Sequence, residues 1–220
     1  MRPTSPQTTP ALELLAAGPM LLEEVSPRLA PTGNEWTAEI KYDGYRLFAL
    51  VAEGRLMLRT RGRNGNPADA TRWYPELRGL TSLPSETVLD GEVAVLDDIG
   101  RSDFESLHAR SRRRKLSPGD RPVAYCAFDL LMLGGKDLRA WPLKRRKEAL
   151  AELLSPPPDH VLFVQDLPGQ VAALYSAALQ LQLEGVVAKR LDSAYQSGAR
   201  SLDWVKVKRP GAVPPERFRR

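Results

Sequence analysis

The sequence predicts an α+β domain in which antiparallel sheets pack together, helices flank them, and a ligand cleft lies between the sheets. Several short segments alternate apolar and polar residues or are apolar throughout, as half-buried and fully buried strands are. Three longer segments, 103–116, 143–154 and 169–183, have the pattern of helices. With 220 residues, the chain is long enough to bury a substantial core.

Composition divides the chain into three parts. Residues 1–18 are rich in proline, threonine and alanine, which predicts a flexible arm. Residues 19–210 contain the folded domain, and residues 211–220 form a short basic tail. A single cysteine, Cys126, excludes a disulfide framework, and no apolar run has the length of a membrane span. We therefore expect a cytoplasmic protein.

The charge balance is mildly basic. Lysine and arginine number 32 against 27 aspartate and glutamate residues, which gives a formal net charge of +5. This excess favours a polyanionic partner, although many solvated surfaces share it. The two histidines, His108 and His160, have no neighbours with the spacing of metal ligands.

The first strand of the predicted sheet begins near Trp36 and carries Lys41 within an apolar run. Glu39 precedes this lysine and an Asp-Gly pair follows it. A free lysine amine has a pKa near ~10.4, so a nucleophilic lysine needs a lowered pKa, for example through partial burial beside other cations. The other interpretation is an edge-strand lysine before an Asp-Gly hairpin turn. The segment alone leaves both interpretations open.

The next elements are mainly strands. Segments 44–52 and 55–61 predict a hairpin that turns at Glu53. Residues 74–77 end a short helical stretch, and 86–96 predicts a further strand pair.

The middle of the chain predicts two helices separated by a buried strand. The helix at 103–116 ends in a basic cluster, 110–115, which suits a solvated helix end, our preferred interpretation, or contact with DNA phosphates. Segment 123–131 is nearly all apolar, as in a strand covered on both faces. The helix at 143–154 has apolar residues on one face and the basic run 144–147 in solvent.

The last third of the chain returns to strands. Three prolines at 156–158 end the preceding helix, and 160–165 predicts a strand. An amphipathic helix at 169–183 is followed by strands at 184–189 and 204–208.

Six segments follow one another in an informative order. They are Lys41-Tyr42-Asp43-Gly44-Tyr45-Arg46, Arg59-Thr60-Arg61-Gly62-Arg63-Asn64-Gly65, Leu89-Asp90-Gly91-Glu92, Phe128-Asp129-Leu130-Leu131, Glu184-Gly185-Val186-Val187-Ala188-Lys189 and Trp204-Val205-Lys206-Val207-Lys208. This series resembles the motifs of the covalent nucleotidyltransferases, which include ATP-dependent DNA ligases, RNA ligases and mRNA-capping guanylyltransferases. The similarity is closest to DNA ligases, particularly the ligase domains of bacterial end-joining systems. It implies the ATP-grasp-like fold of that family.

The resemblance implies a reaction at Lys41. The lysine would attack the α-phosphorus of ATP, expel pyrophosphate and hold AMP as a phosphoramidate. The AMP would then pass to the 5′-phosphate of a DNA nick, and the 3′-hydroxyl would displace it to join the strand. A nucleoid-associated role in DNA repair or recombination follows from this resemblance.

The resemblance also implies how the nucleotide is held. Glu39 and the backbone at Ile40 would read the adenine edge, and the ring of Phe128 would stack on the base. Arg46 and Arg61 would engage ribose or phosphate. The match to the family motif at 59–65 is imperfect, so the second of these arginines could be Arg61 or Arg63.

Arg61 fits the strand register, whereas Arg63 fits the turn, and we prefer Arg61. Glu92 and Glu184 would serve the ribose and a Mg²⁺ or Mn²⁺ ion, because such ions prefer hard oxygen ligands.

Alternate residues of a strand share one face, so Lys206 and Lys208 can point together at the α-phosphate. They would also help to lower the pKa of Lys41.

The expected partner is nicked double-stranded DNA. The residues after Lys208 are too few to build the oligonucleotide-binding (OB) barrel that usually follows in this family. We therefore expect an adenylation domain without this barrel, served by a separate OB-fold or end-joining repair protein. Two alternatives stay open: an RNA ligase or GTP-using nucleotidyltransferase, and a non-catalytic nucleic-acid-binding module of the same fold.

Overall fold

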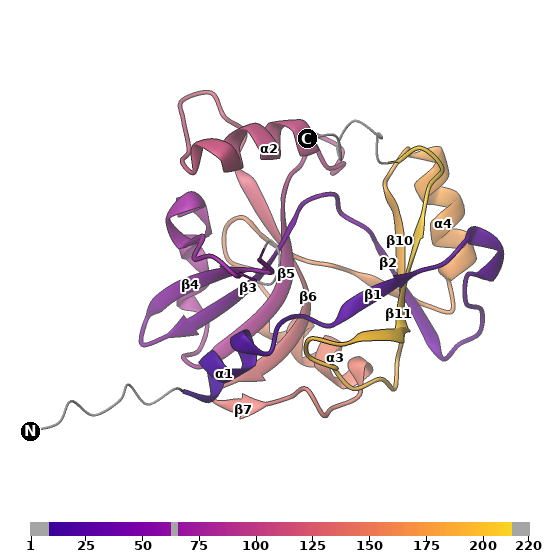
Figure 1. Cartoon of the computed structure of the whole chain (residues 1–220), viewed down its shortest axis with the longest axis horizontal. Helices are drawn as coiled ribbons and strands as arrows, with labels where there is room; N and C mark the ends of the chain where they lie inside the picture. The colour runs from indigo at the N-terminus through magenta and orange to yellow at the C-terminus, as the bar shows by residue number, and fades with distance from the viewer. Residues whose placement is uncertain (1–8, 63–65, 213–220) are drawn as a thin grey trace, which may run out of the picture.

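Two β-sheets form the framework of the computed structural model, which describes residues 9–62 and 66–212 (Figure 1). The six-stranded sheet has the spatial order β4 (Arg55–Thr60), β3 (Tyr45–Ala52), β5 (Thr87–Val95), β6 (Val123–Leu133) and β7 (Lys136–Asp137), and β8 (Val161–Phe163) also pairs with β6. The five-stranded sheet has the order β1 (Leu21–Glu24), β11 (Arg200–Lys208), β10 (Gly185–Arg190), β2 (Trp36–Ile40) and β9 (Asp166–Pro168). Neighbouring strands are antiparallel, except that β1 runs parallel to β11 and β8 runs parallel to β6.

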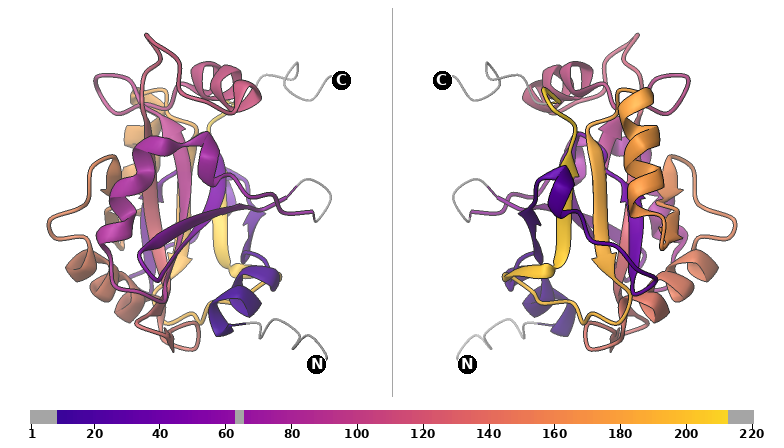
Figure 2. Two further views of the ribbon diagram at one scale, coloured as in Figure 1. Left: turned by 90° about the vertical axis from the view of Figure 1, so that its left-hand side faces the viewer. Right: turned by 90° about the vertical axis from the view of Figure 1, so that its right-hand side faces the viewer.

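Helices flank both sheets. Helix α4 (Val171–Gln180) packs on β10 and β2, as the right-hand view of Figure 2 shows, and α3 (Leu143–Leu153) packs on β6. The other helices are α1 (Pro10–Ala16), α2 (Phe104–Arg113) and the 3₁₀ helices η1 (Pro27–Leu29), η2 (Thr71–Trp73) and η3 (Pro75–Ser82). This architecture confirms the predicted α+β class. Within residues 9–62 and 66–212, no helix is both long and apolar enough to cross a membrane.

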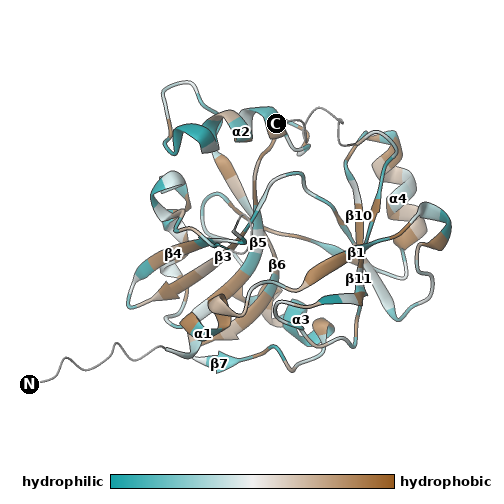
Figure 3. Cartoon of the chain, in the orientation of Figure 1, coloured by the Kyte–Doolittle hydropathy of each residue, from teal (hydrophilic) through white to brown (hydrophobic). Residues whose placement is uncertain are grey.

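The main core lies on one face of the six-stranded sheet. Figure 3 shows hydrophobic residues along the strands of this sheet, whereas α2 is mainly hydrophilic. Leu47, Leu89 and Leu130, from β3, β5 and β6, are buried together with Leu77 and Leu80 from η3. The opposite face of β3 contributes Phe48 to a second buried cluster and carries Arg46, which lines the pocket described below.

The flexible arm expected at residues 1–18 is wrong for α1. The side chain of Thr9 caps this helix by accepting from the N–H of Leu12 at 3.4 Å. Leu14 and Leu15 of α1 are buried in a cluster with Phe48 of β3. The helix has only seven residues and lies in a proline-rich segment, so its few apolar residues did not predict a packed helix. Residues 1–8 and most of the basic tail lie outside the described part of the chain.

The hairpin turn that one interpretation placed after Lys41 is absent, and glycine is required at Gly44 and Gly91 because neighbouring atoms leave no room for a side chain. The Asp-Gly pair ending at Gly44 crosses from one sheet to the other, and a Cβ on Gly44 would lie 2.2 Å from the carbonyl oxygen of Val93. Gly91 lies within β5, where a Cβ would lie 2.5 Å from Cζ of Tyr125. The strand pair expected at 86–96 is thus a single strand.

The basic end of α2 is only partly in solvent. Arg110 is 1% exposed, and its Nη2 donates to Glu76 Oε2 at 2.7 Å. Arg113 is exposed and pairs with Asp120 at 2.7 Å. The expectation of a solvated helix end therefore holds for Arg113 and is wrong for Arg110.

Candidate active site

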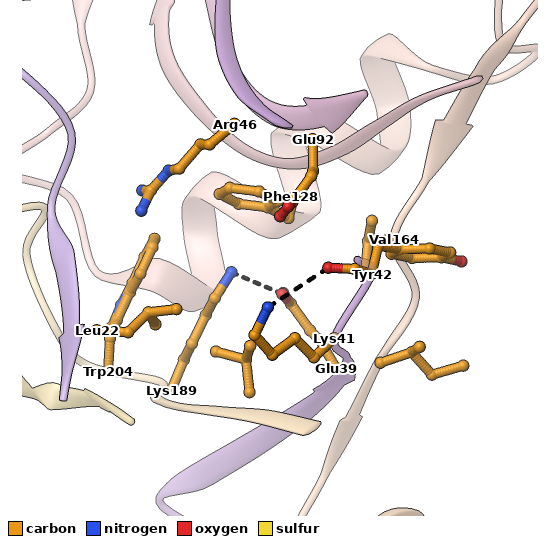
Figure 4. Close-up of a pocket in the computed structure, with 12 residues that line it drawn as sticks. Leu22, Glu39, Lys41, Tyr42, Arg46, Glu92, Phe128, Val164, Lys189 and Trp204 are labelled. Atoms are coloured by element: carbon orange, nitrogen blue, oxygen red, sulfur yellow. Dashed lines mark hydrogen bonds and ion pairs between the residues drawn. The ribbon is translucent and has the colours of Figure 1, made fainter. Parts of the chain in front are cut away.

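A pocket opens between the two sheets and receives side chains from both (Figure 4). Its lining residues are Leu22, Glu39, Ile40, Lys41, Tyr42, Arg46, Glu92, Phe128, Val164, Val187, Lys189 and Trp204. The structure thus brings together six residues that the motifs singled out, namely Glu39, Ile40, Lys41, Arg46, Glu92 and Phe128.

Lys41 lies directly after the end of β2, where the chain crosses between the sheets. Its backbone N–H donates to the carbonyl oxygen of Gly185 at 3.0 Å, which continues the pairing of β2 with β10. Its Nζ donates to Oε2 of Glu184 at 2.7 Å. The residues at the start of β10 therefore hold Lys41 at both its backbone and its ammonium group.

The pKa of Lys41 is raised above its ordinary value. Burial alone would lower this pKa, but the negative charges of Glu92 and Glu184 outweigh burial. Lys41 is thus held as a cation in this structure. A nucleophilic attack by Nζ requires that this proton first be removed.

Lys206 and Lys208 share one face of β11, as expected from their alternation. Both ammonium groups approach the same atom, Oε2 of Glu24 on β1, at 3.3 Å and 2.9 Å. The expectation that they lower the pKa of Lys41 is wrong, because carboxylates dominate the charge around that lysine. Two convergent ammonium groups are nevertheless a suitable site for an anion.

Glu92 projects from β5, and its Oε1 accepts the backbone N–H of Gly44 at 3.0 Å. Burial raises the pKa of Glu92 to about 7, against the opposing effect of the positive charge on Lys41. The nearby charge of Glu184 raises it further. Glu92 therefore titrates near neutral pH.

Glu92 should make the stability of the metal-free protein fall as pH rises. Folded Glu92 holds its proton up to about pH 7, whereas its ordinary pKa is 4.5, so the folded state binds more protons between these values. The unfolding free energy should decrease across this window by at most about 3 kcal/mol. The variant Glu92→Gln, which keeps an acceptor for Gly44, should lose this decrease in urea titrations with EDTA. An unchanged pH profile in the variant would assign the effect to other groups.

Glu92 and Glu184 are also the carboxylates best placed to hold a divalent ion. The charges of both raise the pKa of Lys41, so an ion that they held would lie near this lysine. No group of three or more His, Cys, Asp or Glu residues suited to a metal occurs in the part of the chain that the structure describes. Two carboxylates without a full cage fit Mg²⁺, which usually joins one or two carboxylates to substrate phosphates.

Glu39 is buried and bound by two lysines to which the sequence assigned no role, although Lys189 ends one of the motif segments. Its Oε1 lies 2.8 Å from Nζ of Lys147, and its Oε2 lies 2.6 Å from Nζ of Lys189. The basic run of α3 was expected in solvent, yet α3 buries a stripe with helical spacing: Leu143, Arg146, Lys147 and Leu150. Arg146 and Lys147 lie at helical spacing from the two leucines, and this spacing could have identified both as buried.

The two predicted nucleotide-binding arginines occupy different environments. Arg46 lies in the pocket and donates to Asp90 through Nε at 3.0 Å and Nη2 at 2.6 Å. Its guanidinium carbon lies 5.2 Å from the centre of the Phe128 ring. Arg61 follows β4, is exposed and is not part of the pocket lining, and the competing Arg63 lies outside the described residues.

Comparisons with known proteins agree on one family. A family model described as "ATP dependent DNA ligase domain" matches residues 19–208. The chain is 34% identical over 190 residues to the SPbeta prophage-derived DNA ligase-like protein LigB of Bacillus subtilis, covering 86% of this chain and 66% of that protein. It is 37% identical over 213 residues to the multifunctional non-homologous end joining protein LigD of Pseudomonas aeruginosa, covering 93% of this chain and 24% of that protein.

A solved structure supports the same relationship. The structure described as mycobacterial DNA ligase D complexed with ATP and MES matches with a TM-score of 0.72 and 34% sequence identity, covering 87% of this chain and 60% of that chain. The chain spans less than two thirds of each of these relatives, so it corresponds to a part of them.

Proposed function

Since the chain belongs to the ATP-dependent DNA ligase domain family, we propose that it is an adenylation domain in which Lys41 accepts AMP from ATP. One observation carries this proposal. The ammonium group of Lys41 lies at the junction of the two sheets, between carboxylates and beside a pocket with an aromatic wall. A nucleotide in this pocket would have its base among apolar side chains and its phosphates near the lysine.

The proposed first step forms one bond and breaks another. Deprotonated Nζ of Lys41 attacks the α-phosphorus of ATP, a P–N bond forms, and the bond to the pyrophosphate oxygen breaks. The nearest acceptor for the proton is Oε2 of Glu184 at 2.7 Å. A divalent ion held by Glu92 and Glu184 would neutralise negative charge on the phosphates.

The cations on β11 have a proposed role in the same step. Lys206 and Lys208 would exchange Glu24 for phosphate oxygens and stabilise the charge that develops on them. Arg46 would orient the nucleotide from β3, and Phe128 would stack on the base. Arg61 stays a proposed contact to ribose or to the nick.

The proposed second substrate is DNA with a nick. The 5′-phosphate at the nick takes AMP from Lys41, and the 3′-hydroxyl then displaces AMP to seal the strand. The name of the relative LigB, a DNA ligase-like protein, supports DNA as this partner, and that of LigD supports a role in end joining. An OB-fold or an end-joining protein would hold the duplex against the domain.

Labelled nucleotides test this proposal directly. The chain is incubated with Mg²⁺ and either [α-³²P]ATP or [α-³²P]GTP, and the label on the protein is then chased with nicked DNA or nicked RNA. We expect label from ATP alone and its transfer to the 5′-phosphate of nicked DNA. Label from GTP alone, or transfer to RNA alone, would contradict the proposed substrate. The absence of label from both nucleotides would contradict adenylation by this chain.

A further inference from the structure

A carboxylate of strand β1 is bound by two ammonium groups of the neighbouring strand β11. Oε2 of Glu24 lies 3.3 Å from Nζ of Lys206 and 2.9 Å from Nζ of Lys208. We call these three residues the Glu24 latch. The hydrogen bond from Lys208 lowers the pKa of Glu24, so Glu24 is an anion at neutral pH. One carboxylate oxygen thus neutralises both of the lysines that are the proposed contacts for phosphate.

The register of the five-stranded sheet places the two lysines on the face that forms the pocket. Lys206 pairs with Val187 of β10, and Val187 pairs with Glu39 of β2. Residues that pair directly across neighbouring strands share one face of the sheet. Val187 and Glu39 both line the pocket, so Lys206 lies on the same face. Lys208, two residues further along β11, shares this face.

Lys208 lies at the end of the sheet that holds Lys41. It pairs with Gly185, whose carbonyl oxygen accepts the backbone N–H of Lys41 at 3.0 Å. Glu184 binds the ammonium group of Lys41 at 2.7 Å. Burial raises the pKa of Glu184, and the positive charges of Lys41 and Lys208 both oppose this rise. The charge of Lys208 therefore acts on the carboxylate beside the proposed nucleophile.

Strand β1, which lies beside β11 in Figure 1, brings Glu24 to the same place. Leu22 lines the pocket and Glu24 follows two residues later, so both side chains lie on one face of β1. The N–H of Val25 donates to the carbonyl oxygen of Lys206 at 3.1 Å, which fixes the backbone of β1 beside the lysines. The backbone thus holds Glu24 on the pocket face, next to Lys206 and Lys208.

The latch can open without a change in the backbone. The side chain of Glu24 is 52% exposed, whereas those of Lys206 and Lys208 are 23% and 28% exposed. Rotation of the Glu24 side chain into water would leave both ammonium groups facing one ligand. A triphosphate offers more oxygens and more negative charge than one carboxylate, so it can take the place of Glu24. Ion pairs between partly exposed groups are weak, and their exchange therefore has a modest cost.

We propose that Glu24 is an internal competitor for the polyphosphate part of the nucleotide: it binds Lys206 and Lys208 until phosphate oxygens displace it. Glu24 thereby lowers the affinity of the pocket for phosphate and leaves its affinity for the nucleoside unchanged. This inference rests on the proposed ATP site and adds the residue that opposes phosphate binding there. Glu24 is not part of the pocket lining, and none of the six motif segments includes it.

Binding of inorganic tripolyphosphate, ATP and adenosine tests this role. Affinities of the full chain are measured by calorimetry in EDTA, so that no metal-dependent adenylation interferes. Glu24→Gln keeps the size of the side chain and removes its charge. We expect this variant to bind tripolyphosphate and ATP about three- to tenfold more tightly than wild type does, and adenosine equally well. A second variant, Glu24→Ala, should give the same gain.

Two further variants separate the latch from a general effect of charge. Glu23→Gln is the matched control, because Glu23 is the adjacent residue of β1 and pairs with Arg200 at 3.4 Å instead. It removes the same charge and should leave the affinity for tripolyphosphate within about twofold of wild type. In a Lys208→Met background, which lacks the shorter of the two ion pairs, Glu24→Gln should give a smaller gain than in wild type.

Three results would overturn the inference. The first is that neither Glu24 variant binds tripolyphosphate more tightly than wild type. The second is that Glu23→Gln gains as much as Glu24→Gln, and the third is that adenosine gains as much as ATP. Failure of the proposed function gives a different result, since wild type would then form no AMP adduct with Mg²⁺, whereas the tripolyphosphate titrations do not depend on adenylation.

Discussion

Replacing Lys41 by arginine should abolish AMP attachment while leaving ATP binding largely intact. In wild type, Nζ of Lys41 forms an ion pair with Oε2 of Glu184 at 2.7 Å. Arginine keeps a positive charge opposite Glu184 and Glu92, so it can replace this ion pair. A guanidinium group stays protonated in proteins and has no free lone pair with which to attack phosphorus. The variant therefore removes the nucleophile and retains the charge.

The measurement is label transfer from [α-³²P]ATP, with ATP affinity measured separately in EDTA. We expect adduct at background and an affinity within a few-fold of wild type. Lys144→Arg is a control with the same chemical change on the exposed face of α3, and it should still form adduct. Undiminished label on Lys41→Arg would place the nucleophile at another residue.

Removing Asp129 should produce the largest loss of stability. Asp129 and Arg146 are both 0% exposed and form a two-pronged pair, Nε to Oδ1 at 2.9 Å and Nη2 to Oδ2 at 3.0 Å. In Asp129→Ala the buried guanidinium loses its counter-ion, which should lower the unfolding free energy by about 3–5 kcal/mol.

Urea unfolding with a matched surface variant measures this effect. Arg145→Ala, on the same helix but exposed, should change the unfolding free energy by less than about 0.5 kcal/mol. A loss below about 1 kcal/mol in Asp129→Ala would mean that the Arg146–Asp129 pair contributes little to the fold.

Local patterns predicted much of the fold. The expected hairpin exists as β3 and β4, and its turn residues Glu53 and Gly54 have φ values of 50° and 69°. The helices expected at 143–154 and 169–183 are α3 and α4. In each case, the signal lies in adjacent residues and needs no information from the rest of the chain.

Features that depend on distant partners were not predictable from these patterns. β1 is a short strand that gains its place by pairing in parallel with β11, about 180 residues later in the chain. Gly44 and Gly91 look like turn residues, but glycine is needed there because backbone or ring atoms of other strands leave no room for a side chain. The sequence pattern shows the glycine, but it does not show the distant residue whose atoms exclude a side chain at that position.

The same division holds for the site. The motifs located Lys41, Glu92 and Phe128, which meet in one pocket. They did not reveal Lys147 as a partner of Glu39, because a basic run on a helix normally faces solvent. They also gave the wrong direction for the pKa of Lys41, since the order of motifs does not say which charges lie nearest in space.

The most direct test of the central claim is to map the residue that carries AMP. The chain is incubated with Mg²⁺ and ATP, digested under mildly alkaline conditions that preserve a phosphoramidate, and analysed by tandem mass spectrometry. We predict one AMP per chain, attached to Nζ of Lys41. AMP on any other residue, or no AMP on a chain that binds ATP, would contradict the claim that Lys41 is the acceptor.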